Sequence, residues 1–148
     1  MIKKASVHEA LLQHQNDIII ELEEYLKGYH TALDIDEEDT KDMDDLARQD
    51  SASDMLHNIE LQLHQAKNDR LKLNKILPIR TEAITVGSLV ITENYKFYIS
   101  IPNHSFKVEK EEYIGIASDS PLYLFMKGKK EGDRFSFNKK DYLIKKVL

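Results

Sequence analysis

The spacing of apolar residues changes near the middle of the chain. From Val7 to Ala32 the apolar residues recur at intervals of three, four or seven positions, and a similar spacing returns from Leu56 to Leu77. Alternation of this kind is typical of the seam of a coiled coil. Beyond Pro78 the period becomes two, as in β-strands. The pattern therefore predicts a helical half followed by a β-rich half.

The helical half is predicted to fold as an antiparallel hairpin. Neither helical segment has a second apolar face, so each needs the other to bury its seam. About 27 residues per helix, at a rise of ~1.5 Å, would give an arm of roughly 40 Å. We assign 1–77 to this hairpin, with an acidic tip at 34–50. The predicted seam residues are Val7, Leu11, Ile18, Leu22, Tyr25, Tyr29 and Ala32 in the first helix, and Leu56, Ile59, Leu63, Ala66, Leu73 and Leu77 in the second, with Arg70 in a seam position.

The β-rich half, 78–148, is predicted to contain two hairpins and one short helix. "SLVIT" and "YKFYISI", joined at Glu93-Asn94, form the first hairpin, and "RFSF" and "YLIKKV", joined across 138–141, form the second. Between them, Ser120 suits an N-cap, Pro121 the first helical position and Gly128 a helix stop. The predicted fold class is α+β: a helical hairpin followed by a small antiparallel β domain with one short helix.

The segment "DIDEEDTKDMDD" at 34–45 concentrates negative charge, with eight acidic residues among twelve. Like charges about 4 Å apart repel by roughly 1 kcal/mol even in water. Residues 1–80 carry 17 acids and 10 bases, whereas 81–148 carry 9 acids and 11 bases. The acidic half disfavours DNA as a direct partner. The segment is either a solvated loop or a surface directed at a basic or Mg²⁺-rich target.

The composition of the chain excludes several classes of protein and of binding site. There is no cysteine, so disulfides and thiolate metal sites are excluded. No apolar stretch approaches the ~20 residues of a membrane span, and we expect a cytoplasmic protein without membrane contact. Nucleotide-binding and nucleophile motifs are missing, so we expect neither an enzyme nor catalytic residues. His57, Glu60 and His64 share a helix face, but they flank the seam and are interpreted as solvated rather than as a metal site.

Three stretches in the β-rich half resemble the C-terminal domain of the Gre family of bacterial transcript-cleavage factors. These stretches are "VGSLV" (86–90), "SDSPLYLFMKGKKEGD" (118–133) and "YLIKKV" (142–147). The family's Ser-Pro, glycine and Gly-Asp align with Ser120-Pro121, Gly128 and Gly132-Asp133. The resemblance implies an FKBP-like domain that docks, through Asp119, Ser120 and Pro121, on the rim of the secondary channel of RNA polymerase. It also implies that the preceding hairpin reaches toward the catalytic Mg²⁺.

The tip departs from the Gre pattern. The Glu-Asn-Ala-Glu-Tyr type motif, whose acids help those factors to hold a second Mg²⁺, is missing. Instead "DMDDLA" (42–47) resembles the coiled-coil tip of DksA, which enters the same channel. The DksA acids align with Asp42 and Asp45 and its alanine with Ala47, and Asp44 is the neighbouring acid. The four-cysteine zinc site of DksA is missing, so the resemblance to DksA is confined to the tip.

Together these features indicate a monomeric, non-enzymatic regulator of bacterial RNA polymerase that acts through the secondary channel. We expect no cofactor of its own and no metal in the isolated protein; any Mg²⁺ involved would be that of the polymerase active site. One alternative is a transcript-cleavage elongation factor of Gre type. Another is a coiled-coil adaptor or chaperone-like protein unrelated to polymerase.

Overall fold

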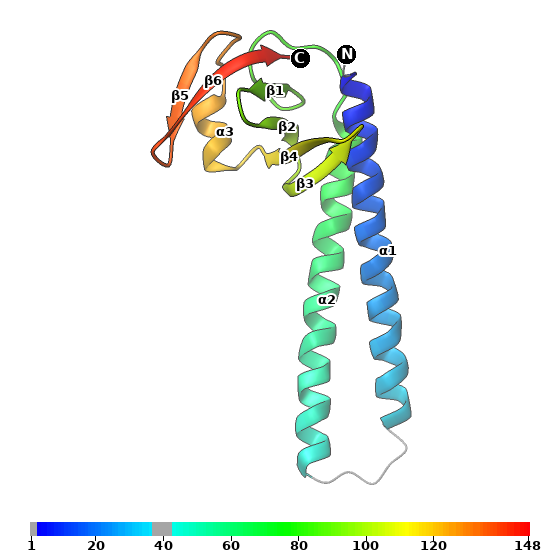
Figure 1. The fold of residues 1–148 in the computed structure, drawn as a ribbon. Helices are drawn as coiled ribbons and strands as arrows, with labels where there is room; N and C mark the ends of the chain where they lie inside the picture. Colours follow the sequence, from blue (N-terminus) through cyan, green and yellow to red (C-terminus); the bar gives the residue numbers. More distant parts are fainter. Residues whose placement is uncertain (1–2, 37–42) are drawn as a thin grey trace. The chain divides into compact units, whose positions relative to one another are not determined.

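The computed structural model describes residues 3–36 and 43–148, and the side chains of 3–29 and 51–148. It confirms the α+β class: two long helices precede a six-stranded sheet and a short helix (Figure 1). The chain divides into two compact units, Met1–His14 with Arg70–Leu148, and Gln15–Asp69. The elements are α1 (Lys4–Asp36), α2 (Met43–Lys75), β1 (Leu89–Thr92), β2 (Lys96–Ser100), β3 (Asn103–Val108), β4 (Glu111–Ala117), α3 (Pro121–Met126), β5 (Arg134–Phe137) and β6 (Lys140–Val147).

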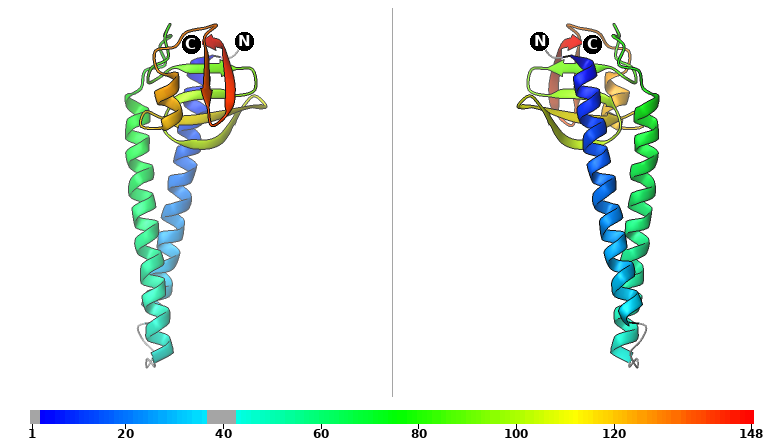
Figure 2. Two further views of the ribbon diagram at one scale, coloured as in Figure 1. Left: turned by 90° about the vertical axis from the view of Figure 1, so that its left-hand side faces the viewer. Right: turned by 90° about the vertical axis from the view of Figure 1, so that its right-hand side faces the viewer.

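In the unit Gln15–Asp69, α1 and α2 run side by side (Figures 1 and 2). They pack along an apolar seam. Buried Gln15 interrupts this seam and donates from Nε2 to the carbonyl oxygen of Ala66 at 2.9 Å. A buried amide without a partner would be costly, so this hydrogen bond favours one alignment of the two helices. The seam consists of buried Ile19, Leu63 and Ala66 with partly buried Ile18, Leu22 and Leu26.

The predicted seam is only partly right in α1. Ile18 and Leu22 pack against the seam as expected, but Ile19 is the buried isoleucine, and Tyr25 is 56% exposed while Leu26 packs in its place. Three consecutive isoleucines occupy this point of the sequence, so the apolar pattern alone does not select which one faces α2. Leu77, predicted as the last seam residue, lies beyond the end of α2 and is 67% exposed.

The sheet has the strand order β3-β4-β2-β1-β6-β5. Both predicted hairpins are present, β1 with β2 and β5 with β6, each antiparallel. The second turn is tighter than predicted, because β6 begins at Lys140 and only Asn138 and Lys139 connect the strands. These two residues have φ values of 50° and 64°, and positive φ at both positions matches the twist of the flanking strands.

Two strands, β3 and β4, lie where the sequence pattern predicts none. Their apolar alternation is short: in β3 exposed Lys107 lies between buried Phe106 and half-buried Val108, and β4 begins with exposed Glu111 and Glu112. The prediction was an antiparallel sheet. The observed sheet is mostly antiparallel, because β4 pairs with β2 in parallel. A Cβ atom added to Gly115 of β4 would lie 2.3 Å from the carbonyl oxygen of Ile101. The close approach of these two backbone segments therefore requires glycine at this position.

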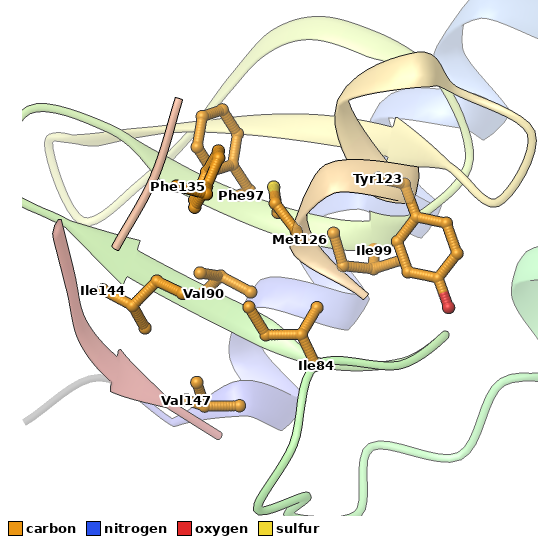
Figure 3. Packing of buried hydrophobic residues seen from close by; sticks show 9 residues of the cluster. All are labelled: Ile84, Val90, Phe97, Ile99, Tyr123, Met126, Phe135, Ile144 and Val147. Carbon is orange, nitrogen blue, oxygen red and sulfur yellow. The ribbon is translucent and has the colours of Figure 1, made fainter. Parts of the chain in front are cut away.

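The sheet buries apolar side chains on both faces. On one face, Tyr123 and Met126 of α3 pack against side chains of the strands (Figure 3). On the other, residues from the ends of α1 and α2 complete the core. The first cluster comprises Ile84, Val90, Phe97, Ile99, Tyr123, Met126, Phe135, Ile144 and Val147, and the second comprises Val7, Leu11, Leu73, Leu89, Tyr98, Ile101, Phe106 and Tyr113.

The second cluster crosses the domain boundary that was expected at residue 77. Val7 and Leu11 of α1 and Leu73 of α2 are fully buried in the same cluster as the sheet residues. The compact unit that contains the sheet therefore includes both helix ends. Independent folding of 78–148 stays a prediction. We expect such a fragment to be less stable than the same domain in the full chain, because it lacks these three side chains.

Polar contacts reinforce the start of α1. The Nζ atom of Lys4 donates to the main-chain oxygens of Ile79 and Leu148, the latter at 2.9 Å. Lys4 is only 8% exposed, and burial lowers the pKa of its ammonium group to about 8. The fully buried hydroxyl of Tyr98 lies 2.5 Å from Nδ1 of His8, which satisfies that hydroxyl. Burial also lowers the pKa of His8.

We expect Leu73→Ala to lower the free energy of unfolding by about 2–5 kcal/mol, because it leaves a cavity in the second cluster. Leu71→Ala is the matched control, since Leu71 is 57% exposed on the same helix and should change stability by less than about 0.5 kcal/mol. Urea unfolding followed by circular dichroism measures both. Equal losses in the two variants would contradict the assignment of Leu73 to the core.

We expect the buried Lys4 to make stability depend on pH. Its pKa in the folded chain is about 8, below its ordinary value of 10.5. Between these values the unfolded chain binds more protons, so the free energy of unfolding should rise with pH across this window. Urea unfolding at several pH values within it should show a smaller rise for Lys4→Met than for the unmodified chain. The prediction fails if the two chains show the same pH dependence.

Candidate functional site

The helix α3 is positioned by its flanking backbone. Ser120 precedes it with an extended conformation (φ −66°, ψ 135°), and Pro121 is its first residue. The predicted N-cap position of Ser120 is confirmed, but its side chain makes no capping hydrogen bond. After the helix, Gly128 adopts φ +80° and donates from its N–H to the carbonyl oxygen of Ile84 at 2.9 Å. The helix is thus held at both ends by the main chain.

The helix has one buried and one exposed apolar side. Tyr123 and Met126 are 4% and 0% exposed, whereas Leu124 and Phe125 are 65% and 53% exposed. The ring of Phe125 lies with its centroid 5.4 Å from that of half-buried Phe137 in β5. Exposed apolar side chains that gather in this way are typical of a protein-binding site. We call Asp119, Ser120, Pro121, Leu124 and Phe125 the α3 surface.

The structure brings the three predicted docking residues to the beginning of this surface. Asp119 and Pro121 are exposed and Ser120 is half-buried. The sequence-based reasoning missed Leu124 and Phe125. A signal was present, because all six residues of "PLYLFM" are apolar and a helix resting on a sheet buries only one side.

Other residues of the Gre-like stretches have roles within the fold. Gly132 (φ +90°) and Asp133 form a turn in which the Asp133 carboxylate accepts a hydrogen bond from the N–H of Lys130 at 2.8 Å. Gly87 (φ +94°) donates from its N–H to the carbonyl oxygen of Ile99 at 2.7 Å. Buried Ser88 follows it, and its hydroxyl accepts from the N–H of Thr85 at 2.9 Å. These positions shape the backbone of the domain.

The predicted acidic tip lies mostly beyond what the structure describes. Asp42 is outside the described residues. Asp44, Asp45 and Ala47 fall within the described backbone of α2, which begins at Met43, but their side chains are outside the described set. Their placement relative to one another as a functional group therefore stays a prediction.

The possible metal face on α2 is solvated, as predicted. His57, Glu60 and His64 are all exposed. Among the residues whose side chains are described, 3–29 and 51–148, no group of three or more His, Cys, Asp or Glu residues is arranged to hold a metal ion. No helix in this described part is long and apolar enough to cross a membrane.

Comparison with known proteins gives loose structural similarities only. No family model and no curated protein matches the sequence. Among solved structures, the transcription factor Gfh1 is similar over 93% of both chains at 17% identity, with a TM-score of 0.40. GreA factor homolog 1 (Gfh1) of Thermus thermophilus has 17% identity over 93% of this chain and 94% of its own (TM-score 0.38), and Thermus aquaticus Gfh1 has 18% over 94% of each (TM-score 0.38). At these values the likeness establishes neither a family nor a function for this chain.

Proposed function

We propose that this protein is a non-enzymatic regulator of bacterial RNA polymerase that acts through the secondary channel. In this proposal the α3 surface docks on the channel rim, and the acidic segment between α1 and α2 acts near the polymerase's catalytic Mg²⁺. The protein binds no DNA directly and needs no cofactor of its own. The observation that carries the proposal is the overlap between the Gre-like sequence and an exposed apolar surface.

That overlap separates residues needed for folding from residues available to a partner. In the stretch 118–133, Gly128, Gly132 and Asp133 are used by the backbone. Asp119 and Pro121 are exposed close in sequence to the exposed apolar Leu124 and Phe125. Apolar side chains that are more than half exposed contribute little to the core, so a docking role explains why they occur on this helix.

The acidic segment supplies the regulatory part of the proposal. Carboxylates are hard oxygen ligands suited to Mg²⁺ and would also pair with basic walls of a channel. The roles of Asp42, Asp44, Asp45 and Ala47 rest on the sequence resemblance to the DksA tip. Because the Gre-type tip motif is missing, regulation of promoter complexes is favoured over transcript cleavage.

We expect Leu124→Ser to weaken binding to purified RNA polymerase by roughly tenfold, as for a contact at the centre of an interface. Leu77→Ser is the matched control, because Leu77 is 67% and Leu124 65% exposed, but Leu77 lies outside the α3 surface. Ser120→Glu should also weaken binding to the polymerase. Competition against a fluorescently labelled copy of the unmodified protein measures all three.

Equal affinities for Leu124→Ser, Ser120→Glu and the unmodified chain would overturn the docking role of the α3 surface. Circular dichroism and thermal unfolding of each variant verify that it remains folded. No binding of the unmodified chain to polymerase would instead favour the adaptor alternative.

We expect the triple variant Asp42→Asn, Asp44→Asn and Asp45→Asn to bind polymerase within about twofold of the unmodified chain, a change below about 0.4 kcal/mol, while losing its effect on promoter complexes. Asp45→Asn should have the largest effect among the single changes. Asp54→Asn is the control, because Asp54 is an exposed acid on α2 outside the predicted tip. Transcription from a promoter and from a backtracked complex, run in parallel, measures the outcome.

These two templates also separate the rival functions. Shortened transcripts that disappear with Asp45→Asn would make the protein a cleavage factor. Full activity of the triple variant on both templates would mean that the acidic segment is only a solvated loop.

A further inference from the structure

A pocket of about 320 Å³ opens between the β1–β2 turn and the beginning of β6. It shares no residue with the α3 surface and contains none of the residues predicted from the sequence to be functional. Its volume falls at the lower end of the range for small-ligand sites. The lining residues are Thr92, Glu93, Asn94, Tyr95, Lys140, Asp141, Tyr142 and Leu143.

Two tyrosine rings form the aromatic part of this pocket, and both are supported from within the fold. The centroids of Tyr95 and Tyr142 are 6.0 Å apart. Tyr142 stacks on Phe135 at 4.8 Å with an interplanar angle of 6°, and Tyr95 stacks on Phe97 at 5.8 Å. Both phenylalanines belong to the buried core. The tyrosine rings are therefore held in place rather than free to rotate away.

The turn that carries Tyr95 is also fixed. The hydroxyl of Thr92 accepts from the N–H of Tyr95 at 3.0 Å and donates to its carbonyl oxygen at 2.9 Å. The main-chain N–H of Thr92 donates to the same carbonyl at 2.8 Å. A ligand would thus meet a wall that is already formed, which lowers the entropic cost of binding.

A lysine of the chain itself already makes a cation–π contact with this aromatic wall. The Nζ atom of Lys140 lies 5.9 Å from the centroid of the Tyr95 ring, within the distance at which a ring face attracts a positive charge. The lining residues also include two acids, Glu93 and Asp141. Asp141 alternates with Lys140 and Tyr142 along β6, so its carboxylate points to the other face of the hairpin, and Glu93 is the acid available to a ligand on the aromatic wall. Asp141 accepts a hydrogen bond from the Ser136 hydroxyl. In the part of the chain that the structure describes, the Glu93 carboxylate has no ion-pair partner.

We propose that this pocket binds the guanidinium group of an arginine side chain on a partner protein. A guanidinium is planar and stacks on aromatic faces, and two of its N–H groups can donate to one carboxylate, here that of Glu93, at the same time. An ammonium group lacks the flat face, and an anionic nucleotide would be repelled by the Glu93 carboxylate. The proposal does not depend on the polymerase function, because none of its residues belongs to the α3 surface or the acidic segment.

Titration of the full-length chain with N-acetyl-arginine methylamide, followed by NMR of the tyrosine ring signals, tests this assignment. We expect saturable shifts confined to Tyr95, Tyr142 and their neighbours. The lysine analogue should bind more weakly, and adenosine monophosphate should leave these signals unchanged. Tighter binding of adenosine monophosphate than of the arginine probe would overturn the proposal in favour of a nucleotide site, and no saturable shift with any probe would overturn it altogether.

Two substitutions with opposite expected effects distinguish cation binding from a purely structural role. Lys140→Met removes the internal cation and should tighten binding of the arginine probe about two- to fivefold. Glu93→Gln removes a carboxylate and should weaken it by roughly the same factor. Lys145→Met is the control, because Lys145 is an exposed lysine of β6 outside the pocket. Changes of the same sign in Lys140→Met and Glu93→Gln, or weaker binding by Lys140→Met, would contradict the proposal.

Discussion

The sheet has two apolar faces, and the fold depends on covering both of them. The short helix α3 covers one face with Tyr123 and Met126. The other face needs Val7 and Leu11 from the beginning of α1 and Leu73 from the end of α2. These contributions come from points far apart in the sequence, so the two ends of the helical hairpin must meet at the sheet. The requirement makes the base of the hairpin part of the same core as the strands.

Much of this architecture could be predicted because its signals are local. Pro121 and Gly128 mark the two ends of α3, and the period of two identifies β1, β2, β5 and β6. The strands β3 and β4 could not be predicted in the same way. Their apolar alternation spans only a few residues, and the parallel pairing of β4 with β2 depends on contacts distant in sequence. The glycine at 115 becomes understandable only when the approach of the Ile101 carbonyl is seen.

The candidate docking site could be predicted in part. The stretch containing Asp119, Ser120 and Pro121 was located by resemblance, and the structure shows that two of these residues are exposed. Exposure of Leu124 and Phe125 depends on how α3 rests on the sheet, which no local pattern specifies. The register of the α1 seam was ambiguous for a similar reason, since Ile18 and Ile19 are equally apolar and only packing against α2 distinguishes them.

The strand order has a consequence for self-association. The strand order ends in β3 and β5, so these two strands form the outer edges of the sheet. β5 has only four residues and begins with exposed Arg134, and β3 exposes His104 and Lys107 along its length. Short edge strands and charged side chains disfavour the addition of a strand from another molecule. We therefore expect the more strongly apolar strands β1 and β2, which lie in the interior of the sheet, to be shielded from amyloid-like pairing as long as the native strand order is maintained.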